Sequence, residues 1–120
     1  MYTYHNVNPQ GERINDCVTR AIKLASGLEY STIRRKLFHT ARLLDCEKLC
    51  WTCYMFFIQE VLGYQVVNCD HMTVRDFAKK HPQGTYLIRI QGHLTCLIDG
   101  QVHDIWDCTN EGCTIAWYCK

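Results

Sequence analysis

The stretch from residue 84 to residue 108 constrains the fold most strongly. Apolar side chains recur at nearly every second position through three short runs of this stretch, and a period of two is typical of β-strands that are buried on one face. The dipeptide Asp99-Gly100 separates the second run from the third. It is a strong signal for a two-residue hairpin turn, because both residues tolerate a positive φ. The stretch therefore predicts three consecutive antiparallel strands.

Helical patterns come before these strands, after a lead-in over residues 1–15 that is rich in turn formers. Asp16 is a good helix N-cap and Gly27 a good helix end, and the apolar residues between them follow at intervals of three and four. Ser31 is expected to cap a second helix. The last two predicted helices are a buried one over residues 50–62, which are apolar on nearly all sides, and a short one capped by Thr73.

The composition fits a single domain of this kind. The chain has 120 residues, of which 48% are hydrophobic and 21% charged, as in an ordinary soluble domain that can bury a core. The predicted fold class is therefore α+β, with N-terminal helices packed on a C-terminal antiparallel sheet in one domain over residues 1–120. The N-terminal residues lack an apolar run, so we expect no signal peptide and a cytoplasmic protein.

Charge and cysteine content bear on the partners. The formal net charge of +1 argues against broad binding to nucleic acid or to a membrane. The run Arg34-Arg35-Lys36 is expected to be a solvated helix face, and an acidic or phosphate-bearing partner remains the alternative. Nine cysteines without an export signal are expected to be thiols, most of them packed in the core.

Cys17 is the first candidate for chemistry, because the predicted helix begins beside it. Backbone N–H groups at a helix N-terminus favour the thiolate over the thiol and thereby lower the pKa of a cysteine. The N–H of Cys17 would also point to where an oxyanion forms during attack on a carbonyl group. The alternative is that Cys17 only packs beside the apolar stripe of its helix.

His93 is the second candidate, because it opens a predicted strand and faces a return strand that carries Asp104 and Asp107. A general base needs such a carboxylate to fix its tautomer and orientation. A two-residue turn at Asp99-Gly100 places Asp104 on the same face as His93, whereas a three-residue turn with a bulge places Asp107 opposite it. The hairpin pattern alone leaves both aspartates open.

These residues, in this order, resemble the papain-like cysteine peptidase superfamily. The similarity is greatest to its compact branches, the bacteriocin-leader peptidases and the transglutaminase-like domains. It lies in Asp16-Cys17 at a helix start, in Gly92-His93 at a strand start, and in an aspartate that closes the next strand before a threonine, as in Asp107-Cys108-Thr109. The resemblance implies a papain-like fold and a catalytic triad of Cys17, His93 and Asp107.

Two further features follow from resemblance. Papain-like enzymes usually place an oxyanion-binding glutamine about six residues before the cysteine. Here Gln10 lies seven residues before Cys17 and Asn8 nine before, so the resemblance implies one of these two. The chain is also similar to small proteins of bacteriophages and their hosts, which implies a bacterial or phage-infected cell. That similarity lies in Asn8-Pro9-x-Gly11, Asp16-Cys17-x-x-Arg20-Ala21, Gly84-Thr85-Tyr86, His93-Leu94, Asp99-Gly100 and Asp104-x-Trp106-Asp107.

A structural zinc site is the competing interpretation of the cysteines. Cys46, Cys50 and Cys53, followed by Cys69 and His71, supply enough soft ligands for tetrahedral zinc. Their spacing lacks two paired Cys-x-x-Cys motifs, so buried thiols and no cofactor are the expectation.

The sequence thus predicts a cysteine protease-like hydrolase that acts on a peptide, isopeptide or amide bond of a peptide or protein substrate. The alternative is a non-catalytic module on the same scaffold that binds a host or phage protein.

Overall fold

The three central strands form as predicted in the structure, a computed structural model that describes residues 1–47 and 50–120. They are β3 (Thr85–Ile90), β4 (His93–Ile98) and β5 (Gln101–Asp104), and successive strands are antiparallel. Asp99 and Gly100 have φ values of 49° and 78°, as the tight hairpin turn requires. The turn has two residues, because Ile98 pairs with Gln101.

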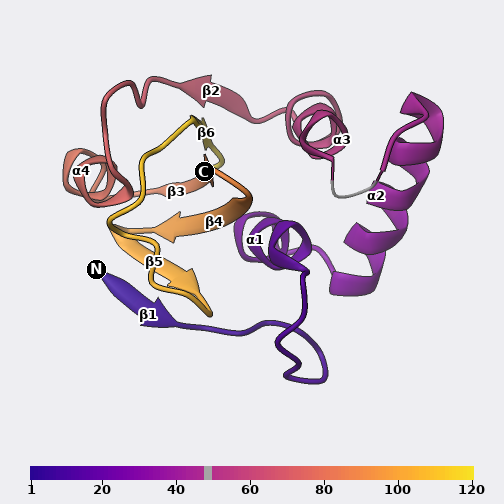
Figure 1. Ribbon diagram of the computed structural model, residues 1–120, viewed down its shortest axis with the longest axis horizontal. Helices are drawn as coiled ribbons and strands as arrows, with labels where there is room; N and C mark the ends of the chain where they lie inside the picture. Colours follow the sequence, from indigo (N-terminus) through magenta and orange to yellow (C-terminus); the bar gives the residue numbers. More distant parts are fainter. Residues whose placement is uncertain (48–49) are drawn as a thin grey trace.

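Three more strands complete a six-stranded sheet, in the order β1-β5-β4-β3-β6-β2 (Figure 1). They are β1 (Tyr2–Tyr4), β2 (Gln65–Val67) and β6 (Ile115–Tyr118). The pairing of β1 with β5 is parallel, and all the others are antiparallel. The α+β class is confirmed, but the sheet is not confined to the C-terminal half. We expected a looped lead-in where β1 forms, because three residues are too few to show a period.

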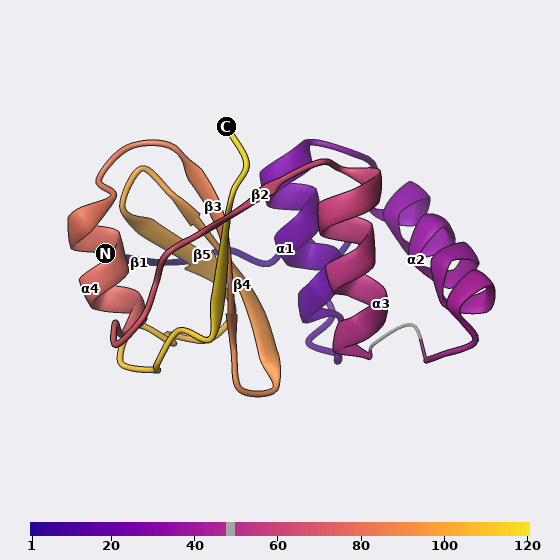
Figure 2. The ribbon, with the colours of Figure 1, turned by 90° about the horizontal axis from the view of Figure 1, so that it is seen from above.

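Helices cover both faces of the sheet (Figure 2). On one face lie α1 (Cys17–Ser26) and α3 (Trp51–Phe56), which continues as a π-helical turn over Phe57–Val61, with α2 (Tyr30–Leu44) outside them. The short α4 (Val74–Lys80) lies on the opposite face. Within the described residues, no helix combines the length and apolar character needed to cross a bilayer.

The helix boundaries test the predicted caps. Thr73 caps α4 through a capping box with Asp76, as expected. Ser31 is not an N-cap, because α2 already begins at Tyr30, whose buried ring belongs to the first turn. The third helix is less buried than its composition suggested, since Trp51 is 46% exposed.

The core consists of two layers, one on each face of the sheet. Alternate residues of β3 point to opposite faces, so that Leu87 packs with the α1 to α3 layer and Ile88 with α4. Helix α1 packs against β4. This contact brings the first residue of α1, Cys17, to the first residue of β4, His93, although the two are far apart in the sequence.

Candidate catalytic site

Cys17 lines a pocket of about 240 Å³ between the start of α1, α3 and the β3–β4 hairpin. The residue is only 9% exposed. As the first residue of α1, it has a backbone N–H without an intrahelical acceptor. The pocket is lined by Asn15, Cys17, Val18, Trp51, Tyr54, Arg89, Gly92, His93 and Leu94.

Cys17 and His93 perturb each other's ionisation. Burial raises the pKa of the Cys17 thiol, but hydrogen bonds with the His93 side chain and the Leu94 backbone outweigh it, so that the pKa is lowered overall. Burial opposes the charged form of His93, yet hydrogen bonds to Asp104 and Cys17 raise the pKa of the imidazole to about 9. A lowered thiol pKa beside a raised imidazole pKa favours a thiolate–imidazolium pair at neutral pH.

Asp104 is the carboxylate that orients His93. His93 Nε2 and Asp104 Oδ2 are 2.6 Å apart, so Nδ1 is the ring nitrogen available to the thiol of Cys17. Burial raises the pKa of Asp104, but the hydrogen bond and charge of His93 outweigh it and lower the pKa overall. This geometry is the alternative that the two-residue turn favoured, and Asp104 is 2% exposed.

Asp107, which the resemblance favoured, does not hold His93. Its Oδ1 accepts hydrogen bonds from the Thr109 backbone N–H at 3.1 Å and from the Thr109 hydroxyl at 2.7 Å. The side chain is exposed. Because the Asp99-Gly100 turn contains two residues, Asp107 falls past the end of β5 and forms a local turn instead. The assignment of the third position is therefore corrected from Asp107 to Asp104.

A buried arginine, Arg20, supports the carboxylate of Asp104 from the side away from His93. Its Nη1 donates to Asp104 Oδ1 at 3.0 Å, and its Nε donates to Asp16 Oδ1 at 2.6 Å. All three residues are at most 5% exposed. The sequence reasoning missed this role of Arg20, although its spacing of four residues from Asp16 on one helix was a usable signal.

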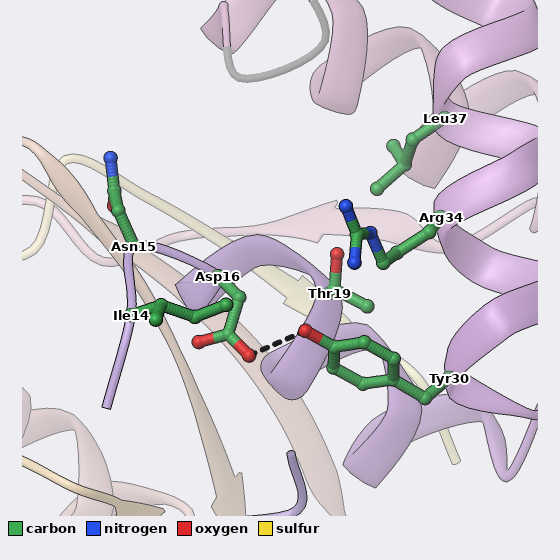
Figure 3. A pocket seen from close by; sticks show the side chains of 7 residues that line it. All are labelled: Ile14, Asn15, Asp16, Thr19, Tyr30, Arg34 and Leu37. Atoms are coloured by element: carbon green, nitrogen blue, oxygen red, sulfur yellow. Dashed lines mark hydrogen bonds between the residues drawn. The ribbon is translucent and has the colours of Figure 1, made fainter. Parts of the chain in front are cut away.

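The Asp16 carboxylate is held by this cluster and does not cap α1. Its Oδ2 accepts from the Tyr30 hydroxyl at 2.6 Å and from Asn8 Nδ2 at 3.0 Å, and no side-chain cap forms at the helix start. Figure 3 shows the Tyr30 hydroxyl pointing at this carboxylate. The expected side-chain cap was therefore wrong, and the first N–H groups of α1 keep their partial positive charge next to Cys17.

The two expected oxyanion donors lie elsewhere. Asn8 is buried, and its amide nitrogen is committed to Asp16 while its oxygen accepts from the backbone of Gln10 and Glu12. Gln10 is exposed and lines a different hollow, beside α2. Asn15, which was not one of the two expected donors, is among the residues that line the pocket of Cys17. In Figure 3 its side chain turns away from the carboxylate of Asp16.

Aromatic rings and a second arginine complete the walls of the site. The rings of His93 and Trp106 meet edge to face with centroids 5.1 Å apart. In the same pocket, the Arg89 guanidinium lies 5.0 Å from the centroid of the Trp51 ring, and its Nε donates to the Tyr54 hydroxyl at 2.9 Å. The sequence did not indicate this contact, because Arg89 lies on β3 and the two rings lie on α3.

The structure also bears on the competing zinc interpretation. Cys53 is fully buried, its thiol donates to the Leu37 carbonyl at 3.5 Å, and burial together with Cys46 raises its pKa to about 11. These contacts are those of a thiol packed in the core. In the part of the chain that the structure describes, the only potential ligand cluster is His93, Asp104 and Cys108, and its first two members already bond to each other.

The site thus combines a thiol at a helix start, an imidazole and a buried carboxylate at one pocket. That arrangement can ionise the sulfur and can carry a proton to and from a bound group. No protein-family model, curated protein or solved structure matches the chain significantly.

Proposed function

We propose that the protein is a cysteine protease-like hydrolase that cleaves a peptide, isopeptide or amide bond through Cys17, His93 and Asp104. The observation that carries the proposal is that Cys17 lines one pocket together with His93, whose imidazole a buried aspartate holds at 2.6 Å. The pocket that leads to this sulfur gives a carbonyl group a place to bind.

The first half of the reaction forms a thioester. The Cys17 thiolate attacks the carbonyl carbon, and a C–S bond forms while the carbonyl π electrons move to oxygen. The Cys17 N–H, together with the Asn15 amide, stabilises the oxyanion. When the oxyanion collapses, the C–N bond breaks, and the His93 imidazolium gives its proton to the leaving amine.

The second half releases the acyl group. Neutral His93 takes a proton from a water molecule, which attacks the thioester carbon, and collapse expels the Cys17 thiolate together with a free carboxylic acid. Asp104 keeps the ring oriented throughout. Because the pKa of His93 is about 9, hydrolysis that needs the imidazolium is expected to fall as the pH rises through that value.

A papain-like scaffold is part of the proposal. The order of the three residues supports it, with a cysteine at a helix start, a histidine at a strand start and an aspartate on the next strand. The chain departs from the pattern at the oxyanion donor, because we assign this role to Asn15, which lines the pocket, and not to a residue further upstream.

Adduct formation tests the proposed function. The protein would be incubated with peptidyl acyloxymethyl ketones of mixed side chains, and the adducts would be measured by intact mass and mapped by peptide mass analysis. We expect one equivalent on Cys17, and none at that position in C17A. A wild-type Cys17 that reacts with none of these probes would overturn the hydrolase and would leave the non-catalytic binding module.

Asn15→Ala is expected to lower the rate of acyl transfer by roughly 10- to 1,000-fold, the usual effect of removing one oxyanion donor. Asn15 lines the pocket, and the substitution removes the amide that we assign to the oxyanion, a charge that exists only after attack. Hydrolysis of an activated ester would be measured, with Q10A as the matched amide control. Equal losses in N15A and Q10A would refute the assignment of Asn15.

A further inference from the structure

Arg89 lines the same pocket, and its guanidinium forms no ion pair among the residues that the structure describes. Arg89 donates from Nε to the Tyr54 hydroxyl at 2.9 Å and from Nη1 to the Thr114 hydroxyl at 3.1 Å. These partners are neutral. Among residues 1–47 and 50–120, the ion pairs within 4.0 Å involve Arg20 and His93 and not Arg89.

The pocket as a whole is cationic. None of its nine lining residues is acidic, whereas Arg89 and the protonated His93 both carry positive charge. The charge of His93 is balanced by Asp104, whose Oδ2 lies 2.6 Å from Nε2 of the imidazole. Arg89 is therefore the charge in this pocket that remains to be neutralised.

The neighbours of Arg89 fix its orientation. The Trp51 ring lies under the guanidinium at 5.0 Å, and the two hydroxyl acceptors hold Nε and Nη1. The described contacts engage neither N–H of Nη2. A planar guanidinium that is already held on one side loses little entropy when it binds a carboxylate with its free edge.

We propose that Arg89 is a specificity residue that binds a carboxylate of the substrate, so that the protein prefers an acidic side chain on the residue whose carbonyl is attacked. The inference rests on the proposed function, since it assigns a substrate class to the same pocket. Trp51 would cover the bound side chain and exclude water, which strengthens the charge pairing.

The test uses three acyloxymethyl ketone probes that differ only in the residue next to the ketone: aspartate, leucine or lysine. In each, the Cys17 thiolate attacks the methylene carbon, a C–S bond forms, and the C–O bond breaks to release a carboxylate ion. We expect the aspartate probe to label Cys17 roughly 10-fold or more faster than the leucine probe, as hydrogen bonds to a charged group allow. The lysine probe should be slowest.

Charge reversal at the same position supplies the decisive comparison. In R89E the order of the aspartate and lysine probes should invert, and in R89M, which keeps the aliphatic stem, the acidic preference should disappear without a basic one. R35E, on the exposed face of α2, should keep the wild-type order. Iodoacetamide labelling of Cys17, followed in every variant, reports that the site is still folded.

The outcomes separate the two proposals. Equal labelling by the three probes in the wild type, or an order that R89E and R89M leave unchanged, would overturn the carboxylate pocket while the hydrolase stands. A Cys17 that neither the probes nor iodoacetamide label would overturn both.

Discussion

Asp104→Asn is expected to remove most of the reactivity of Cys17, whereas Asp107→Asn is expected to leave it unchanged. The hydrogen bond to Asp104 is the leading contribution that raises the pKa of His93 to about 9. Without that carboxylate the imidazole loses its proton near neutral pH, and the thiol loses the cation that lowers its own pKa. The rate of acyl transfer at neutral pH should fall on the order of 100-fold or more.

The same substitution should destabilise the protein, because it leaves the buried Arg20 with one carboxylate instead of two. Breaking a buried ion pair costs about 3–5 kcal/mol in the free energy of unfolding. Urea unfolding and site-resolved alkylation of Cys17 would be measured on D104N and D107N side by side. Loss of reactivity in D107N with full reactivity in D104N would return the orienting role to Asp107.

Arg20→Met is expected to be the most destabilising substitution in the support of the site. Arg20 is 4% exposed, and its guanidinium bridges the carboxylates of Asp16 and Asp104, which are also buried. Methionine fills similar space but leaves the buried Asp16 without its cation and Asp104 with His93 alone. We expect a loss of about 3–5 kcal/mol in the free energy of unfolding, and a midpoint of thermal unfolding lower by roughly 10 °C or more.

Arg35→Met provides the matched control, because Arg35 lies on the exposed face of α2 and surface substitutions usually change the free energy of unfolding by no more than about 0.5 kcal/mol.

The pH dependence of stability adds a second check on R20M. Asp16 and Asp104 have lowered pKa values in the folded protein, so they stabilise it above the ordinary carboxyl pKa, and this stability is lost as the pH falls through the folded values. In R20M the loss should begin at a higher pH than in R35M. Identical unfolding curves for the two variants would contradict the bridging role.

The sequence predicted the local features of the fold well, because each depended on a few neighbouring residues. The start of α1 at Cys17, its end at Gly27, the Thr73 cap and the Asp99-Gly100 turn all appear in the structure. The helix end, the Thr73 cap and the hairpin turn rest on preferences that act within one turn of chain, whereas α1 begins at Cys17 without the side-chain cap expected from Asp16. Cys17 and His93 became candidates because Cys17 stands at a predicted helix start and His93 at a predicted strand start.

The remaining parts of the site depend on contacts between distant residues. The choice between Asp104 and Asp107 depends on how many residues form the turn between β4 and β5. The alternation of apolar residues in the two strands does not determine that number. The contact of Arg20 with Asp104 spans 84 positions, so no local preference signals it. Asn8 looked available as an oxyanion donor because its role in fixing Asp16 appears only after the lead-in folds over α1.

The pH dependence of Cys17 alkylation, in the wild type and in His93→Ala, tests the central claim most directly. Iodoacetamide labelling would be followed by mass analysis of the peptide that contains Cys17. Cys50 serves as an internal reference, because the backbone and side chain of Thr52 lower the pKa of its thiol. We expect wild-type Cys17 to react well below the pH range of an ordinary thiol, and in H93A to react only toward about pH 8–9, with Cys50 unchanged. A Cys17 profile that is the same in both proteins would contradict an activated thiolate–imidazolium pair.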